Sequence, residues 1–203
     1  MTTKSSFKQL REEEREIRKK LIMEAALSLF DVKPFHDIGM RDIADKAGIS
    51  PASIYRYFPT RDDLFAEVLS QDISEIESLI QSKQQEGNAN YESLIRGIID
   101  YTMTNDAKFQ MMCHCMIGQG INQRVLSGYR DIESYLLTLF EKAFRDAGVR
   151  ENVPFRVQAV LCSLIGIIMV FKNYPGMTDK EKKDHMFKVA MATRYPDGKG
   201  PES

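Results

Sequence analysis

Thiol, thioether and imidazole groups gather in the run KFQMMCHCM, from Lys108 to Met116. Such groups bind soft metals, and a cysteine near a histidine is the pair used in nucleophilic catalysis. Successive residues of a helix point about 100° apart, so Cys113, His114 and Cys115 cannot converge on one ion or one substrate. We therefore favour core packing for this run and expect no metal site, no cofactor and no enzymatic activity.

A second group of residues, between Arg41 and Arg61, suits the recognition of nucleic acid. Arginine makes bidentate contacts to guanine and to phosphate, and tyrosine hydroxyls donate to phosphate oxygens. The residues from Pro51 to Phe58 predict a helix of about two turns, since Ser50 can cap it and Pro59 stops it. Ile54 and Phe58 lie four residues apart and are expected to face the core. The residues left facing outward are Pro51, Ala52, Ser53, Tyr55, Arg56 and Tyr57.

Three helices must hold this segment in place. The first is predicted from near Ser6, where a capping-box pattern occurs, and is closed by Pro34. The second runs from about Met40 to Ala47. The tight turn that follows, Gly48-Ile49-Ser50, joins it to the segment at 51–58, and this pattern is typical of a helix-turn-helix.

The remaining chain also favours helices. A capping box at Thr60 starts a helix to about Leu79, which the polar stretch 81–90 ends. Five more helices are expected at about 91–104, 106–118, 122–147, 154–173 and 178–194, with Asn152 as one N-cap. No run alternates at period two. The sequence thus predicts an all-α fold of about nine helices.

Charge and composition narrow the function. The 203 residues carry 28 Lys and Arg against 29 Asp and Glu, but the part through Arg61 has 12 against 9 and is the basic part. Three cysteines make no disulfide framework, which favours a reducing cytoplasm. The most apolar stretch, Ala159–Phe171, has 13 residues, fewer than the roughly 20 of a membrane span. We expect neither a membrane segment nor an export signal.

Residues Ile22–Leu69 resemble the DNA-binding segment of TetR-family transcriptional regulators. The resemblance rests on Ala25-Ala26, Leu29-Phe30, Ile43-Ala44, Ala47-Gly48-Ile49-Ser50, Tyr55-Arg56-Tyr57-Phe58, Arg61 and Leu64. It implies base contacts from Arg41, Pro51, Ala52, Ser53 and Tyr55, and phosphate contacts from Arg56, Tyr57 and Arg61. Gly39 departs from the family, which has Ser or Thr at this helix cap.

The resemblance further implies a repressor that leaves its pseudo-palindromic operator when a small apolar or aromatic effector binds. The expected effector pocket comprises Tyr101, Phe109, Met112, Met116 and Tyr129. The expected domains are a DNA-binding part at 1–60, with 1–5 disordered, an effector-binding and dimerisation part at 61–195, and a mobile tail at 196–203.

The expected partner of the C-terminal half is a second copy of the chain. Val157–Phe171 is apolar on almost every face and must be covered, so helices 154–173 and 178–194 predict a homodimer interface. Its polar rim would be Lys172, His185, Lys188 and Arg194. Two alternatives remain, a helical interaction adaptor and an enzyme that uses His114 with Cys113 or Cys115.

Overall fold

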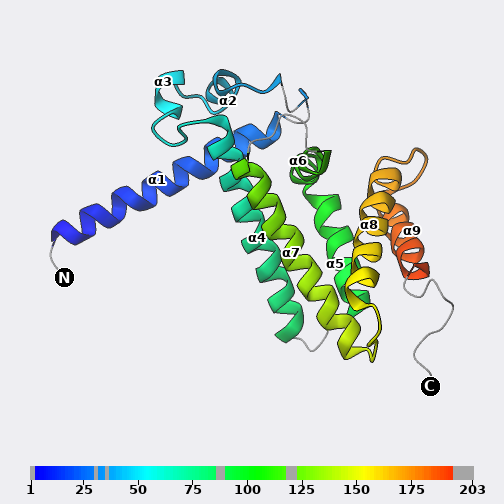
Figure 1. Cartoon of the computed structure of the whole chain (residues 1–203). Coiled ribbons are helices and arrows are strands. Elements are labelled where there is room, and N and C mark those ends of the chain that lie inside the picture. Colours follow the sequence, from blue (N-terminus) through cyan, green and yellow to red (C-terminus); the bar gives the residue numbers. More distant parts are fainter. Residues whose placement is uncertain (1–2, 30–31, 35–36, 86–89, 118–122, 194–203) are drawn as a thin grey trace. The chain divides into compact units, whose positions relative to one another are not determined.

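The computed structural model describes residues 3–29, 32–34, 37–85, 90–117 and 123–193. Within these ranges every regular element is a helix, nine in all (Figure 1), so the predicted all-α fold is confirmed. The chain forms two compact units. The first comprises Met1–Gln71 and Ala107–Tyr129, and the second Asp72–Asp106 and Arg130–Ser203. The predicted functional boundary between residues 60 and 61 stays a prediction.

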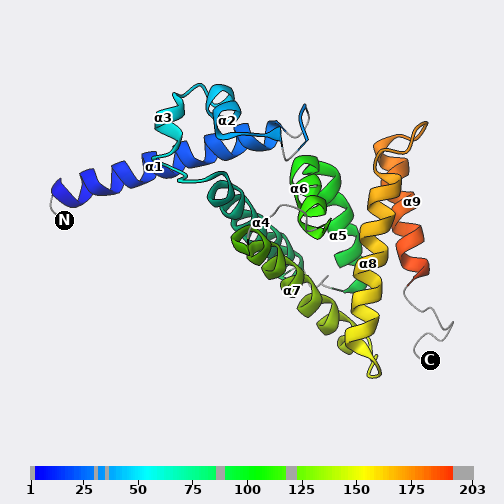
Figure 2. The same ribbon diagram turned by 45° about the horizontal axis from the view of Figure 1, so that its top comes forward.

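The first unit contains α1 (Thr3–Ser28), α2 (Met40–Lys46), α3 (Pro51–Ile54) and the beginning of α4 (Arg61–Gln85). In both ribbon views α2 and α3 lie against the same side of α1 (Figures 1 and 2). Each helix contributes fully buried apolar side chains, which form a small continuous core. These residues are Ile22, Met23 and Ala26 of α1, Ile43 and Ala44 of α2, Ile54 of α3, and Leu64 and Phe65 of α4.

Local hydrogen bonds explain the turn between α2 and α3. Gly48 has φ +69°, a left-handed conformation that glycine adopts without a Cβ clash, and Ile49 N–H donates to the Ala44 carbonyl at 3.0 Å. Ser50 Oγ then accepts from the Ser53 amide at 3.2 Å, and Pro51 occupies the first helical position. The predicted helix-turn-helix is present.

The first unit also contains α6 (Asp106–Ile117) from Ala107 onward and the beginning of α7 (Gln123–Asp146). Here α7 packs closely on α4, because a Cβ built on Gly128 would lie 3.3 Å from Leu69 Cβ. Arg124 of α7 also forms an ion pair with Asp63 in the first turn of α4. The start of α7 is therefore tied to the helix that follows the recognition segment.

The second unit contains α5 (Tyr91–Thr104), α8 (Val153–Phe171) and α9 (Asp179–Ala192), which lie side by side in both views (Figures 1 and 2). The Tyr91 ring packs edge-on against Phe140 and Phe144 of α7, at centroid distances of 5.8 and 5.3 Å. The Arg96 guanidinium of α5 lies 3.4 Å from the Phe187 ring centroid of α9. Contacts with aromatic rings thus join α5 to α7 and to α9.

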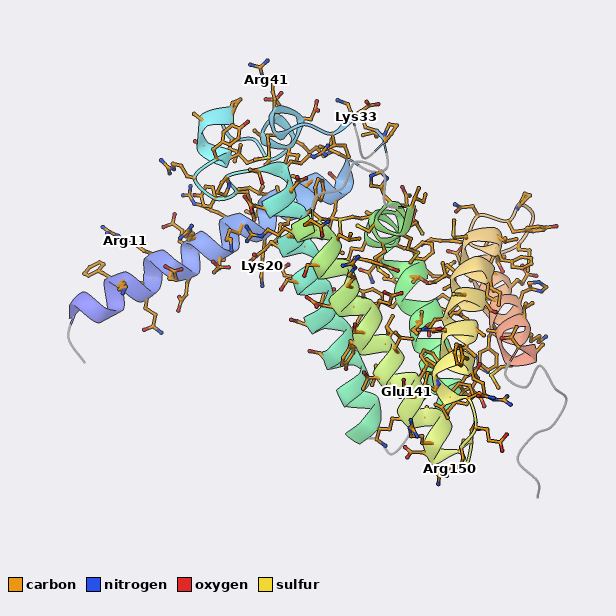
Figure 3. All side chains as sticks on the ribbon, in the orientation of Figure 1. Arg11, Lys20, Lys33, Arg41, Glu141 and Arg150 are labelled. Atoms are coloured by element: carbon orange, nitrogen blue, oxygen red, sulfur yellow. The ribbon has the colours of Figure 1, made fainter. Side chains whose placement is uncertain are left out.

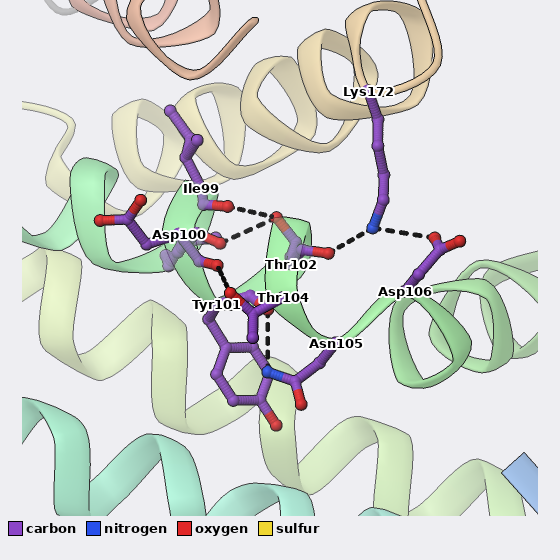
Figure 4. A network of polar contacts seen from close by, with 9 residues as sticks. Ile99, Asp100, Tyr101, Thr102, Thr104, Asn105, Asp106 and Lys172 are labelled. Atoms are coloured by element: carbon purple, nitrogen blue, oxygen red, sulfur yellow. Dashed lines mark hydrogen bonds and ion pairs between the residues drawn. The ribbon is translucent and has the colours of Figure 1, made fainter. Parts of the chain in front are cut away.

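A buried lysine joins α8 to the end of α5 (Figure 4). Lys172 is only 7% exposed, and its Nζ donates to the Thr102 carbonyl and lies 2.8 Å from Asp106 Oδ1. The expectation that Lys172 lines a solvent-exposed rim is therefore wrong, since it neutralises a carboxylate and caps the last turn of α5 instead. His185 packs against the Phe171 ring at 4.5 Å, Lys188 is exposed, and Arg194 lies outside the described residues.

One face of α8 remains exposed in the single chain. Phe155, Met169 and Val170 are 74%, 56% and 62% exposed, while Val157, Leu164 and Ile168 on the opposite face are buried. By length and composition the whole helix is apolar enough to cross a membrane, with 33% of its most apolar window buried. The apolar helix exceeds the 13 residues counted from the sequence, so length does not exclude a membrane span.

Several predicted boundaries need correction. α1 begins at Thr3, so residues 3–5 are helical rather than disordered, because the strong helix formers that follow them propagate the helix toward the N-terminus. α3 is regular only from Pro51 to Ile54, although turns continue to Phe58. α4 continues to Gln85, beyond the predicted end at Leu79. Asn152 adopts a left-handed φ of +52° and caps α8 with no side-chain hydrogen bond. Residues 1–2 and the predicted tail 196–203 lie outside the described residues.

Candidate nucleic-acid interface

The recognition segment, Pro51–Phe58, divides into a buried and an outward side. Ile54 and Phe58 are 0% and 2% exposed, as their four-residue spacing predicts. Phe58 N–H donates to the Ile54 carbonyl at 3.0 Å, so the chain keeps one helical turn beyond the end of α3. The outward positions, of which Ser53 and Tyr57 are half-buried, are Pro51, Ala52, Ser53, Tyr55, Arg56 and Tyr57.

This segment is braced from behind by Lys19 of α1. Its Nζ lies 5.8 Å from the centroid of the Phe58 ring and 2.9 Å from Glu67 Oε1 of α4. Cation–π and ionic contacts of one ammonium therefore link α1, the recognition segment and α4. Although Lys19 belongs to the basic part of the sequence, it serves the internal geometry of the site.

Arg41, the predicted base contact of α2, is exposed and points away from the protein (Figure 3). The N-terminus of α2 is fixed next to it. Asp42 Oδ2 accepts from the Gly39 amide at 2.9 Å, and its Oδ1 accepts from Lys33 Nζ at 2.7 Å. These bonds hold the pKa of Asp42 below its ordinary value, the Lys33 contact contributing most. Asp42 thus makes one bond of a capping box, from its side chain to the Gly39 amide, while Gly39 has no side chain to make the reciprocal bond to the Asp42 amide.

Arg61, the predicted phosphate contact of α4, already has partners within the protein. Its Nη1 donates to the Ile38 carbonyl at 3.2 Å, and its Nε lies 3.8 Å from Asp62 Oδ1. The side chain is 27% exposed. The bond to the Ile38 carbonyl anchors the segment before α2. The phosphate contact stays a prediction, and a structural role is added to it.

The sequence reasoning missed a basic cleft beside the recognition segment. The N-terminal half of α1 and the end of the recognition segment form an open cleft of about 360 Å³. The Arg18 guanidinium donates to Glu14 Oε1 at 2.7 Å and to Tyr57, and these two bonds, Glu14 first, raise the pKa of Arg18. The cleft, called the α1–α3 cleft below, is lined by Arg11, Glu14, Arg15, Arg18, Arg56 and Tyr57.

A sequence signal for the cleft exists. Lys8, Arg11, Arg15 and Arg18 recur at intervals of three and four residues, which puts them on one face of a helix. The acidic residues interspersed with them mask this pattern when the charges are simply added. Only the fold shows that the same face meets Arg56 and Tyr57.

The predicted effector residues lie in both units. Phe109, Met112 and Met116 are on α6 and Tyr129 on α7, in the first unit, and Tyr101 is on α5, in the second. Phe109 is buried, while the other four are partly exposed. Tyr101 Oη also donates to Glu75 Oε2 at 3.4 Å. Their role in effector binding stays a prediction.

Cys115, in the Cys-His run of α6, is buried and protonated. Cys115 is 1% exposed, and burial raises its pKa from 9.0 to about 11, so it is protonated at neutral pH. Cys113 and His114, half-buried, lie on other faces of the helix. Among the described residues no group of three or more His, Cys, Asp or Glu side chains is placed to hold a metal ion.

Comparisons with known proteins relate the helix-turn-helix to one family. Residues 22–68 match the family model described as bacterial regulatory proteins, tetR family. Over 81 residues, which are 40% of this chain and 42% of the relative, the chain is 33% identical to the HTH-type transcriptional regulator YdgC of Bacillus subtilis (strain 168). The chain thus spans about two fifths of the length of this curated relative.

Solved structures share the fold over most of the chain. The fatty acid degradation regulator FadR of Bacillus halodurans superposes with a TM-score of 0.72 at 13% identity, covering 89% of this chain and 96% of that one. Thermus thermophilus FadR, a transcriptional repressor solved in complex with lauroyl-CoA, gives 0.59 at 16% identity, covering 91% and 98%. At these identities the likeness establishes the fold alone.

Proposed function

We propose that the chain is a member of the TetR family of bacterial regulatory proteins, whose model matches residues 22–68, and that it is a cytoplasmic transcriptional repressor and not an enzyme. It binds a pseudo-palindromic DNA operator as a homodimer and leaves the operator when a small molecule binds. The observation that carries this proposal is the recognition segment. Its two core residues, Ile54 and Phe58, are buried, while its polar and basic residues face outward beside the exposed Arg41.

The outward residues suit the two tasks of a DNA reader. Arg41 reads a guanine in the major groove through a bidentate contact, and Ala52 and Ser53 approach thymine methyl groups. Tyr55 and Pro51 lie on the same exposed segment and complete the base-facing set. On this account the recognition segment enters the groove and α2 crosses the phosphate backbone.

Phosphate contacts position the reader without carrying sequence information. Arg56 and Tyr57, near the end of the recognition segment, line the α1–α3 cleft, and Arg61 is the first residue of α4. Arg61 remains in the proposed set because its side chain is 27% exposed and stands at the start of α4. It therefore contributes both to the fold of the helix-turn-helix and to binding.

A second copy of the chain covers the exposed face of α8. Along this face the exposed residues Phe155, Ala159, Cys162, Gly166, Met169 and Val170 recur at helical intervals of three and four. Large side chains occupy its ends and small ones its middle, so two such helices can cross closely. A Cβ built on Gly166 meets no atom within 4 Å in the single chain, which leaves this space to a partner. α9 contributes the exposed Lys188 to the rim.

The effector acts through α6 and α7. An apolar or aromatic ligand would bind near Met112 and Met116, whose flexible thioethers adapt to varied shapes. Thermus thermophilus FadR, of the same fold, is a repressor solved in complex with lauroyl-CoA. The Arg124–Asp63 ion pair and the contact of Gly128 with Leu69 then pass a movement of α7 to α4, next to the recognition segment.

Selection of bound genomic fragments tests this function. The purified protein, mixed with fragments of the source genome, is expected to enrich sites that share an inverted repeat with half-sites about one duplex turn apart. Arg41→Ala is expected to enrich sites degenerate at one position of each half-site. Fragments without a shared motif would contradict the proposal.

Light scattering tests the dimer with a pair of matched variants. Gly166→Arg leaves the single chain undisturbed, since the position is open, and is expected to give monomers that bind the selected duplex at least 100-fold more weakly, because a monomer engages one half-site only. Gly166→Ala is expected to remain dimeric. A dimeric Gly166→Arg protein, or flotation of the wild type with phosphatidylcholine vesicles, would contradict the assignment of this face to a second copy.

A further inference from the structure

The first half of α1 contributes almost no side chains to the core of the first unit. Of the side chains from Phe7 to Leu21, all are exposed except Lys19, and the buried residues of α1 begin only at Ile22. This exposed part, residues 7–21, extends for about 22 Å at ~1.5 Å per residue. It lies in unit 1 and projects beyond α2 and α3 in both views (Figures 1 and 2). Because these side chains are exposed, their burial contributes almost nothing to stability. The basic side chains among them are therefore available to bind a partner.

The charges of this exposed helix are ordered. Lys8, Arg11, Arg15 and Arg18 occupy an arc of about 80° on one face, by helical geometry. Arg11 and Arg41 both leave their helices toward the top of Figure 3, whereas Lys20 leaves α1 on its other side. The basic face is therefore the face that continues toward the recognition segment.

In the α1–α3 cleft this basic face of α1 lies next to the end of the recognition segment. Four guanidinium groups and the Tyr57 hydroxyl line it, against one carboxylate, Glu14. Glu14 is bonded to Arg18 at 2.7 Å, which leaves the cleft with a surplus of positive charge. Planar guanidinium groups bind phosphate oxygens through paired N–H donors, and tyrosine adds a neutral donor. The cleft is thus matched to a phosphate group in both charge and donors.

We propose that the α1–α3 cleft binds a backbone phosphate of the duplex outside the half-site, and that Lys8, Arg11 and Arg15 continue these contacts along the flanking DNA. The inference rests on the proposed function, because the recognition segment must lie in the major groove for its neighbour to reach the flank. An exposed helix of about 22 Å spans about six base pairs at ~3.4 Å each. These contacts add affinity and salt dependence and read no bases.

The test combines two protein variants with two duplex lengths. The duplexes carry the inverted repeat recovered by genomic selection and end either about 12 or about 2 base pairs beyond each half-site. Arg11→Gln/Arg15→Gln removes two cleft charges from an exposed surface, and Lys20→Gln removes one from the opposite face of the same helix. Circular dichroism melts are expected to be the same for all three proteins, since none of these side chains is buried.

The wild type and Lys20→Gln are expected to bind the long duplex at least 10-fold more tightly than the short one, and Arg11→Gln/Arg15→Gln to lose most of this preference. On the long duplex the double variant lowers the log–log salt slope by about 2 to 4, roughly one unit for each phosphate that the dimer no longer neutralises. Arg11→Lys/Arg15→Lys restores most of the slope because it keeps the charge.

The possible failures are distinguishable. If the wild type prefers no duplex, the proposed function fails. If it prefers the selected duplex but the double variant loses the same factor on trimming as the wild type, only the flank contact is overturned. Titration with inorganic pyrophosphate separates a free anion from DNA. Saturable binding that the double variant abolishes, with no dependence on flank length, would assign the cleft to a small phosphate compound instead.

Discussion

Arg124 of α7 forms an ion pair with Asp63 in the first turn of α4. Asp63 has a second task there, because its carboxylate accepts from the Thr60 hydroxyl at 2.8 Å and from the Thr60 amide at 3.1 Å. Thr60 lies two residues after Phe58, the last residue of the recognition segment. The Asp63 carboxylate therefore connects the capping box at the start of α4 with α7, the helix proposed to move when the effector binds.

The two partners of this ion pair are expected to differ in their contribution to stability. Arg124 is 68% exposed, so Arg124→Gln should lower the free energy of unfolding by less than about 1 kcal/mol. Asp63→Asn also weakens the capping box and should cost about 1–2 kcal/mol. Urea unfolding of both variants and of the double variant checks this order. A larger loss for Arg124→Gln would mean that the pair, and not the cap, stabilises the start of α4.

Arg41→Ala and Arg61→Ala are expected to impair binding in different ways. Arg41 is exposed and makes no part of the core, so its loss should cost about 1–3 kcal/mol at one base pair of each half-site and leave stability unchanged. Arg61→Ala should weaken all duplexes alike and also lower the melting temperature, because the Ile38 carbonyl loses its donor. Binding to a panel of single-base operator variants separates the two. Site-selective loss with Arg61→Ala would contradict its assignment to phosphate.

Cys115 is expected to make stability depend on alkaline pH. Burial raises the pKa of Cys115 from 9.0 to about 11, so the folded state holds this proton more tightly than the unfolded state. Its stabilising contribution is complete below pH 9 and is lost as the pH rises from 9 to 11. Cys115→Ala should remove that part of the pH dependence in urea titrations. An unchanged slope in the variant would show that Cys115 is solvated in the folded protein.

Thiol labelling tests whether a second copy of the chain covers Cys162 on the exposed face of α8. Cys162 is exposed and Cys115 is buried, so a disulfide reagent at mildly alkaline pH should modify Cys162 first in the monomeric Gly166→Arg variant. In the dimeric wild type the second copy should shield Cys162. Equal rates in the two proteins would contradict the assignment of this face of α8 to the interface.

Substitutions of Lys172 and of Asp106 are expected to lower the free energy of unfolding by different amounts. Lys172→Met leaves the Thr102 carbonyl without this donor inside the second unit and should cost about 1–3 kcal/mol of unfolding free energy. Asp106 is 43% exposed, so Asp106→Asn should cost less than about 1 kcal/mol. Thermal unfolding of the two variants checks this. Equal losses would mean that the ion pair outweighs the bond to the carbonyl.

The sequence predicted those features that depend on neighbours along the chain. Period and capping residues placed most helices within one or two residues, and the four-residue spacing of Ile54 and Phe58 predicted their burial. The limits of α3 and α4 were less accurate, because a short polar stretch does not by itself end a helix that packing and strong helix formers sustain.

Features that depend on distant partners could not be read in this way. Lys172 looks like any surface lysine until Thr102 and Asp106 are brought beside it, 70 and 66 residues earlier in the chain. Lys19 and Arg61 look like phosphate ligands, yet they bind Glu67 and the Ile38 carbonyl. The α1–α3 cleft likewise requires the fold, since Arg18 and Tyr57 meet only when α1 packs against the recognition segment.

The outward side of the recognition segment is expected to lie in the major groove of a duplex. Footprinting with dimethyl sulfate on the selected operator probes this placement, since the reagent methylates guanine N7 in that groove. We expect protection of guanines in two half-sites about one turn apart, with one guanine in each regaining full reactivity when Arg41→Ala binds. A bound complex in which every major-groove guanine stays as reactive as in free DNA would contradict it.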